Sequence, residues 1–251
     1  MHHIESDEAE IEAMLRTAHD KEKKILDLTY IDFSGSDDIP ILLGDIVMSS
    51  DLLDWLHIDI SNTLISARGL DEFIGAAKTC IKMESFICRG NELTKESANA
   101  ITKLLCTEGR LMVLDIGHNN IGDGGASIIA NMFSLTSLTL SDMAKRDAES
   151  VSIFTLTILD LSRNSLGDAA VLALCRGFTQ FAIRAKAVNV EPALRVLRLN
   201  GNLITDKGAL CLAQLLNRRK TEQESTTSNS TTITQGRRGG STTINQNDSV
   251  S

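Results

Sequence analysis

The chain has 251 residues, a formal net charge of −8, only two prolines and few aromatic residues (4%). The negative charge argues against a nucleic-acid surface as the main function. Because aromatic residues are scarce, Leu, Ile, Val and Ala must form the core, which suits stacked layers of small and branched side chains.

The first segment, residues 1–22, is acidic and contains an amphipathic helix at Ile4–Ala18. Asp7 and Glu10 are spaced like a capping box. We expect this helix to cover the open end of the first layer; the alternative is a free helix that binds a partner. No hydrophobic signal sequence follows the first Met, which argues against secretion. The longest apolar stretch, Ile39–Met48, is too short to span a membrane and is predicted as a helix.

From residue 23 to residue 217 one pattern recurs with a period of about 28 residues. It is clearest at Leu156–Ala170, where an Asn ends a strand-like L-x-L and a small residue follows six positions later. Two less regular copies, anchored at Ile31 and Thr63, have another residue in place of the Asn. A third copy, at Leu135–Met143, keeps the strand but also lacks the Asn. The copies that keep the Asn are anchored at Asn91, Asn119, Asn164 and Asn202. About seven units therefore fill this range.

Each position in the pattern has a physical role. The L-x-L portion alternates with period two, as a short strand does when one face is buried. The Asn lies where the strand stops, and its side chain can bond backbone groups that a sharp turn leaves unpaired. We therefore expect Asn164→Ala to destabilise the array strongly and Asp160→Ala not to do so. Helix caps, each worth about 1 kcal/mol, are predicted at Thr94, Asp123, Asp168 and Thr205 or Asp206.

These motifs resemble leucine-rich repeats, and the unit length with one helix in each unit resembles the ribonuclease-inhibitor-like subclass. That subclass also supplies the repeat domains of NOD-like receptors and of Ran GTPase-activating proteins. The resemblance covers about three quarters of the chain. It implies an α/β fold, a curved solenoid of about seven units with parallel strands on the concave face and helices on the convex face.

Two segments depart from the period. Between Met143 and Leu156 the unit is short, so the curvature is expected to change there. Residues 178–192 extend the convex side, either as a longer helix packed on the convex layer or as a protruding loop that contacts a partner. After Asn217 the composition turns polar, and residues 218–251 are predicted to be a disordered tail.

The five cysteines, at positions 80, 88, 106, 175 and 211, show neither metal-ligand nor C-x-x-C spacing. Cys88 occupies an apolar strand position, and the three that follow it fall in predicted helices. We therefore expect buried free thiols and a reducing compartment.

The residue between the two core positions of each strand points into the concave face. These residues are Asp27, Asp59, Ile87, Asp115, Thr139, Asp160 and Arg198. Beside them lie Tyr30, Asn62, Arg89, His118, Asp142, Arg163 and Asn200. Four of the first seven are acidic, so this stripe predicts a partner with basic or amide-rich contacts. The alternative is that Asp within the L-D-L strand is simply common in this subclass.

Two sets of site residues follow from the pattern. The predicted partner-binding residues are Asp27, Asp59, Arg89, Asp115, His118, Asp160, Arg163 and Arg198. The structural turn residues are Asn91, Asn119, Asn164 and Asn202.

The pattern favours a non-catalytic scaffold or adaptor that binds a protein partner on the concave face. No nucleophile accompanies His118, and a metal between Asp27 and Asp59 would lack further ligands, so no catalytic, metal or cofactor site is predicted. The alternative is a Ran-type GTPase activator, although that family usually carries an acidic C-terminal region and this tail is slightly basic. We expect a monomer in the cytoplasm, with cytoskeletal association left open and without nucleic-acid or membrane binding.

Overall fold

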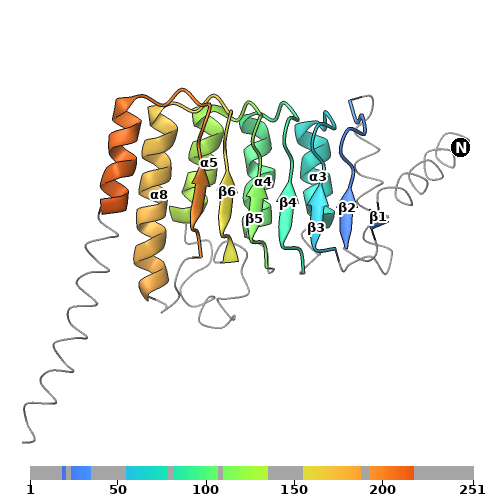
Figure 1. Ribbon diagram of the computed structural model, residues 1–251, viewed down its shortest axis with the longest axis horizontal. Coiled ribbons are helices and arrows are strands. Elements are labelled where there is room, and N and C mark those ends of the chain that lie inside the picture. The colour runs from blue at the N-terminus through green and yellow to red at the C-terminus, as the bar shows by residue number, and fades with distance from the viewer. Residues whose placement is uncertain are drawn as a thin grey trace, which may run out of the picture.

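The computed structural model describes residues 19–20, 24–34, 55–77, 82–106, 110–134, 155–187 and 193–217. Its strands form one sheet in the order of the chain, from β1 to β7 (Figure 1). Strand β1 is antiparallel to β2, and each later strand is parallel to the one before it. The strands are β1 (His19–Asp20), β2 (Ile25–Asp27), β3 (His57–Asp59), β4 (Ser85–Ile87), β5 (Val113–Asp115), β6 (Ile158–Asp160) and β7 (Val196–Arg198).

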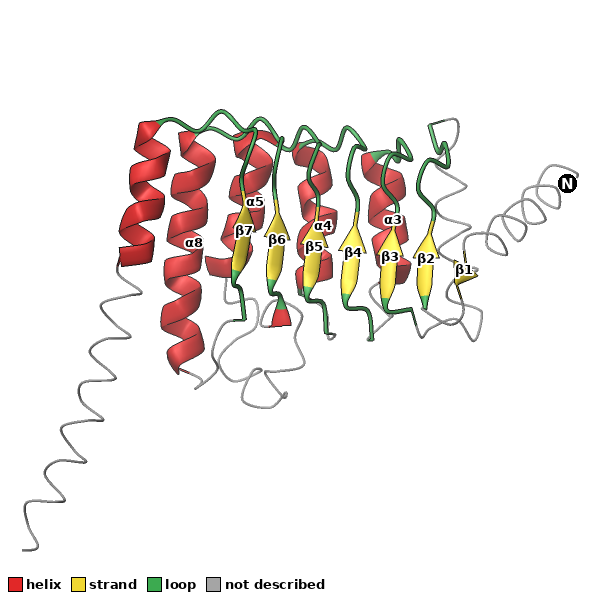
Figure 2. Ribbon diagram, viewed as in Figure 1, coloured by secondary structure: helices red, strands yellow, loops and turns green. Residues whose placement is uncertain are grey.

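Helices carry the chain from the end of one strand to the start of the next. Figure 2 shows the described helices on one side of the sheet, which is the arrangement that right-handed crossovers between parallel strands produce. They are α3 (Ala67–Ala77), the short 3-10 helix η1 (Lys95–Ser97), α4 (Ala98–Leu105), α5 (Gly122–Ser134), α8 (Asp168–Ala187) and a helix over residues 206–217. The predicted solenoid of parallel strands backed by helices is therefore confirmed.

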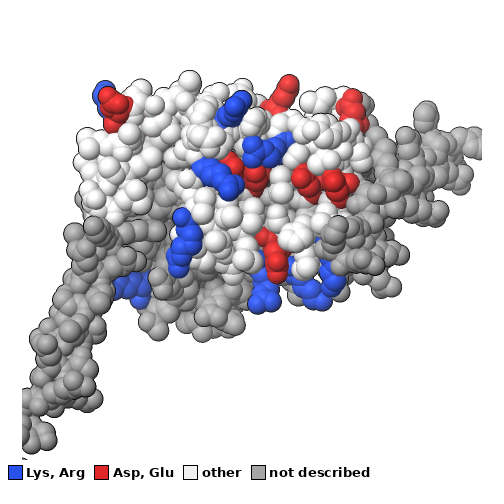
Figure 3. Space-filling view, in the orientation of Figure 1, with Lys and Arg blue, Asp and Glu red and all other residues white. Residues whose placement is uncertain are grey.

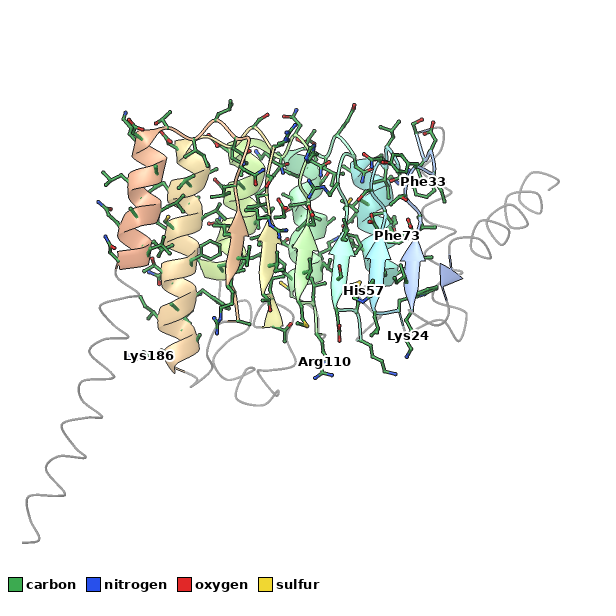
Figure 4. All side chains as sticks on the ribbon, in the orientation of Figure 1. Lys24, Phe33, His57, Phe73, Arg110 and Lys186 are labelled. Atoms are coloured by element: carbon green, nitrogen blue, oxygen red, sulfur yellow. The ribbon has the colours of Figure 1, made fainter. Side chains whose placement is uncertain are left out.

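The core lies between the sheet and the helices. In strands β2 to β6, the central residue and the apolar residue just after the strand point into it and are at most 1% exposed. These residues are Leu26, Leu28, Ile58, Ile60, Phe86, Cys88, Leu114, Ile116, Leu159 and Leu161. One face of each helix closes the core from behind, as Leu70, Phe73 and Ile74 of α3 do. Figure 4 shows Lys24 and Arg110 at the edge of the sheet where the strands begin, and Phe33 at the opposite edge, where the loops run.

The repeated Asn side chains join each unit to the one before it. Asn119 Oδ1 accepts hydrogen bonds from the backbone N–H groups of Asn91 (2.8 Å) and Leu93 (3.1 Å), and Nδ2 donates to the carbonyls of Cys88 and Ile116 (both 2.9 Å). The other three anchors bond the preceding unit in the same way. Each Asn thus satisfies backbone groups of two units at once.

The predicted seventh unit at Leu135–Met143 is wrong as a member of the sheet. Strand β5 pairs directly with β6, with Val113 opposite Ile158 and Asp115 opposite Asp160. No strand of the described chain lies between them, and Thr139 and Asp142 are outside the described residues. Residues 135–150 lie outside the described residues, within which six parallel strands are found.

Two of the predicted helix caps act across units, whereas the Thr205 hydroxyl accepts the backbone N–H of Lys207 in its own helix (3.4 Å). The Asp123 carboxylate accepts hydrogen bonds from the backbone N–H groups of Gly167 (2.6 Å) and Ala170 (3.3 Å), at the start of α8. Asp168 bonds the next helix start in the same way. The prediction that Asp123 and Asp168 cap their own helices is therefore wrong. Each acid instead reaches the unpaired N–H groups and positive dipole end of the following helix.

The extension at residues 178–192 is largely helix, because α8 continues to Ala187. Phe178 and Phe181 are 3% and 6% exposed and lie edge-on to Phe133 of α5, with ring centroids 4.8 and 5.6 Å apart. Such aromatic pairs are a favourable way to bury large side chains. The interpretation as a longer helix packed on the convex layer is confirmed as far as Ala187, and residues 188–192 lie outside the described residues.

Other expectations are met only in part. Strand β1 lies within the acidic N-terminal segment and pairs with the edge of β2. The helices predicted at Ile4–Ala18 and Ile39–Met48, and the tail at 218–251, lie outside the described residues.

The four cysteines that the structure describes carry free thiols, as predicted. Cys88 and Cys175 are buried, whereas Cys106 and Cys211 are only partly buried. Burial raises the pKa of the Cys88 thiol to about 12, so this cysteine stays protonated at neutral pH.

Candidate functional site

The helix-free side of the sheet is the face that the repeat pattern predicts as concave, and we call it the concave face. The last residue of each parallel strand points onto it. The strand register aligns these residues in one row: Asp27, Asp59, Ile87, Asp115, Asp160 and Arg198. Figure 3 looks onto this face; acidic side chains stand apart over β2 and β3, whereas acidic and basic side chains meet over the later strands.

Asp115 and Asp160 lie beneath arginine side chains. Arg89 Nη1 is 2.6 Å from Asp115 Oδ2 and 3.4 Å from Asp160 Oδ2, and Arg198 Nη1 is 3.5 Å from Asp160 Oδ2. The two aspartates are only 8% and 3% exposed. Gly117 leaves room for this arrangement, because a Cβ atom there would lie 3.2 Å from Arg89 Nη1. Two arginines and two aspartates thus form a charge-balanced network.

The aspartates also close the turns that follow their strands. In each of the four, Oδ1 accepts the backbone N–H of the residue two positions later, at 2.9 or 3.0 Å. Such a bond stabilises a sharp change of chain direction. The Asp of the L-D-L strand therefore has a structural role in every unit that contains it, which supports the alternative interpretation of the stripe.

Asp27 and Asp59 differ from the other two because neither forms an ion pair with a described residue. Asp27 is exposed and Asp59 is half-buried. The pKa of the Asp59 carboxyl is raised, because burial and the charges of Asp27 and Asp115 together outweigh the hydrogen bonds from Ser61 that lower it. The end of the row over β2 and β3 is therefore acidic and lacks a compensating positive charge within the described chain.

A second row follows three residues after each strand, where the backbone is left-handed. Its members are Tyr30, Asn62, Gly90, His118, Arg163 and Gly201, with φ between 51° and 72°. Residues other than Gly pay about 1–2 kcal/mol for this conformation, so the fold holds these side chains outward at a cost. Tyr30 is 79% exposed, and the other three side chains of the row are exposed too.

The two glycines of this row are favoured by the positive φ and also lie close to a side chain of the preceding unit. A Cβ atom at Gly90 would lie 2.2 Å from Asn62 Oδ1, and one at Gly201 would lie 2.7 Å from Arg163 Cγ. Each of these side chains therefore rests against the turn of the following unit.

The structure separates the predicted partner-binding residues into two groups. Those outside the network are Asp27, Asp59, His118 and Arg163, and those within it are Arg89, Asp115, Asp160 and the half-exposed Arg198. The sequence contained a signal for the second group, since Arg89 and Asp115 are opposite charges on neighbouring strands. The set also omitted Tyr30, which the pattern had placed beside the stripe.

The contacts of Asp160 argue against the expectation that Asp160→Ala does not destabilise the array strongly. The Asp160 carboxylate is buried, closes a turn through Ser162 and neutralises two arginines. Removing it would leave Arg89 and Arg198 without their shared partner.

Asp160 also gives a pH dependence. Burial alone would raise the pKa of its carboxyl, but hydrogen bonds from Ser162 and the charges of Arg89 and Arg198 lower the pKa below its ordinary value. A lowered folded-state pKa means that the carboxylate stabilises the fold above its unfolded pKa of about 4. This contribution is lost as the pH falls through the folded-state pKa. Urea unfolding of the parent and Asp160→Asn should show a stability gap at pH 7 that closes below pH 4; an equal gap at both would contradict the assignment.

Two further properties of the described residues bear on the kind of site. In the ranges that the structure covers, no three His, Cys, Asp or Glu side chains gather closely enough to hold a metal ion. None of the helices found in those ranges is both long and apolar enough to cross a membrane.

Parallel strands, one helix per unit and an Asn at four of the turns define the class of fold as a leucine-rich repeat solenoid. Three stretches, residues 111–130, 152–175 and 192–213, match a family model described as Leucine Rich repeat. They correspond to the units anchored at Asn119, Asn164 and Asn202. The chain is thus similar to leucine-rich repeat proteins of the ribonuclease-inhibitor-like type.

Individual relatives are similar over part of their length. Ribonuclease inhibitor of Sus scrofa is 26% identical over 166 residues, which are 54% of this chain and 36% of that protein. The chain thus spans just over a third of the curated relative that it matches. Among solved structures, the tropomodulin C-terminal domain of Caenorhabditis elegans shows 13% identity and a TM-score of 0.48, covering 75% of this chain and 96% of that one.

Proposed function

We propose that the protein is a non-catalytic scaffold or adaptor that binds a protein partner on the concave face. The observation that carries this proposal is the carboxylate pair of Asp27 and Asp59, which forms no ion pair with a described residue and lies beside the exposed ring of Tyr30. A partner that sets a Lys or Arg side chain here would supply the missing positive charge, and the ring would add a cation–π contact. The matched relative supports protein binding, since its name describes an inhibitor of an enzyme.

The remaining site residues have different roles in this proposal. The ion pairs among Arg89, Asp115 and Asp160 hold the strands in register. These three side chains do not themselves supply binding energy. His118 and Arg163 project from the turn row and contact acceptor groups of the same partner. The repeat array, residues 23–217, is the binding unit, and its free thiols support a reducing compartment such as the cytoplasm.

Charge reversal tests the proposed contact. Proximity labelling in cells should compare the parent with the double variant Asp27→Lys and Asp59→Lys. We expect the partners labelled by the parent to be lost, because rim charges set specificity and association rate. A matched control, Glu72→Lys with Glu92→Lys, makes the same change in net charge at exposed positions on α3 and in a loop. If the first variant kept the partners, or if both variants lost them equally, the partner would not bind at Asp27 and Asp59.

The alternative activity, Ran-type stimulation of GTP hydrolysis, is tested separately. Hydrolysis by small GTPases is measured with and without the protein. Clear acceleration would replace the scaffold proposal.

A further inference from the structure

The C-terminal end of the described array exposes side chains that the preceding unit buries. Counted from the anchoring Asn, Ala209, Ala213 and Leu216 occupy the same helix positions as Val171, Cys175 and Phe178 of α8. The three residues of α8 are at most 8% exposed. The three in the helix over residues 206–217 are exposed, Leu216 by 66%. These positions lie on one side of a helix, and we call that side the end face.

The core positions of the sheet also become more exposed at β7. The core residues of β2 to β6 are at most 1% exposed, whereas their equivalents Leu197 and Leu199 are only partly buried. Strand β7 is also the edge of the described sheet, with β6 on one side and no described strand on the other. An apolar surface next to an open strand edge favours pairing with another strand.

The sequence that follows this end is poorly suited to cover it. Residues 218–251 contain only three aliphatic side chains, Ile233, Ile244 and Val250, and no aromatic residue. An occupant of the end face must therefore bring its own strand edge and its own apolar side chains.

The same face of a second copy meets both needs. A two-fold axis beside β7 would pair the two β7 edges antiparallel and place the two end faces against each other. The charges near this face lie at its ends and are of both signs, with Arg195 before the strand and Asp206 and Lys207 at the start of the helix. Antiparallel pairing sets the end that carries Arg195 beside the end that carries Asp206 of the other copy, so the rims do not simply repel.

We propose that two copies of this chain associate through β7 and the end face to form a dimer. This replaces the monomer expected from the sequence. The dimer leaves the concave face of each copy open, so it would present two partner-binding surfaces on one assembly.

Sedimentation velocity of the full chain over a range of concentrations tests the dimer. The parent should show a dimer fraction that rises with concentration. Leu216→Glu should raise the dimer dissociation constant by about a hundredfold or more, because each dimer would bury two charges in its interface. The matched control is Leu64→Glu, 44% exposed in the loop before α3 and far from β7 in the strand order. The control should dimerise like the parent.

Thermal melts of both variants confirm that they are folded, as expected for exposed positions. A parent that stays monomeric at every concentration, or a dimer equally sensitive to the two substitutions, overturns the proposal. The variant Asp27→Lys with Asp59→Lys should still dimerise, which separates this test from that of the concave face.

Discussion

Replacing Asn119 by Ala is expected to lower the free energy of unfolding by about 3–5 kcal/mol, because a buried donor or acceptor left unpaired costs about 1–3 kcal/mol. The backbone N–H groups of Asn91 and Leu93 would both lose their acceptor, and the carbonyl of Cys88 would lose its donor. These groups belong to the preceding unit, so the substitution loosens an interface between units as well as a turn. Urea denaturation at pH 7 measures the loss.

The chain supplies a matched control for this prediction in the next residue. Asn120 has the same side chain but is exposed, and its backbone N–H bonds the Leu93 carbonyl whatever the side chain is. Asn120→Ala should change stability by less than about 0.5 kcal/mol. Similar losses for the two variants would show that the side-chain bonds of Asn119 do not hold the units together. Asn164→Ala, at a fully buried anchor, should resemble Asn119→Ala.

The repeat pattern predicted the architecture because the same physical requirement recurs in each unit. An apolar L-x-L followed by an Asn at fixed spacing buries one layer of the solenoid against the next. The register of four units could therefore be predicted from the positions of Asn91, Asn119, Asn164 and Asn202. The pattern failed at Leu135–Met143, where apolar alternation was present but the Asn was not. Alternation alone indicates that a segment can form a strand, and it does not say whether the neighbouring strands leave room for one.

Interactions between units were the part of the site that the sequence did not reveal. Asp123 was predicted to cap α5 because caps are read from local sequence, yet its carboxylate bonds the start of α8. Arg89 and Asp160 form an ion pair although they are 71 residues apart in the chain. Only the stacking of consecutive units brings such residues together. The repeat position alone does not distinguish the two accessible carboxylates, Asp27 and Asp59, from the two buried ones, since all four occupy the same place in the unit.

The junction of α5 and α8 carries the second large effect. Gly177 of α8 faces the backbone of α5, and a Cβ atom at this position would lie 2.4 Å from the carbonyl oxygen of Ala130. Real Cβ atoms do not approach this closely, and the obstacle is backbone, so the helices must move apart. Overpacking of this kind costs about 1–3 kcal/mol, and we expect Gly177→Ala to fall near the upper value.

Gly75→Ala is the control for Gly177→Ala, because the same substitution should have the opposite sign there. Gly75 lies in α3, and an added Cβ atom would meet nothing within 4 Å. With no clash, the better helix propensity of Ala should stabilise the protein by about 0.5–1 kcal/mol. Urea unfolding of both variants measures the two changes. If Gly177→Ala also stabilised the protein, helix propensity would dominate and the close approach of α8 to α5 would not limit that position. Loss of stability in Gly177→Ala together with a gain in Gly75→Ala would instead show that the packing distance between consecutive helices, and not the glycine backbone itself, selects the residue at position 177.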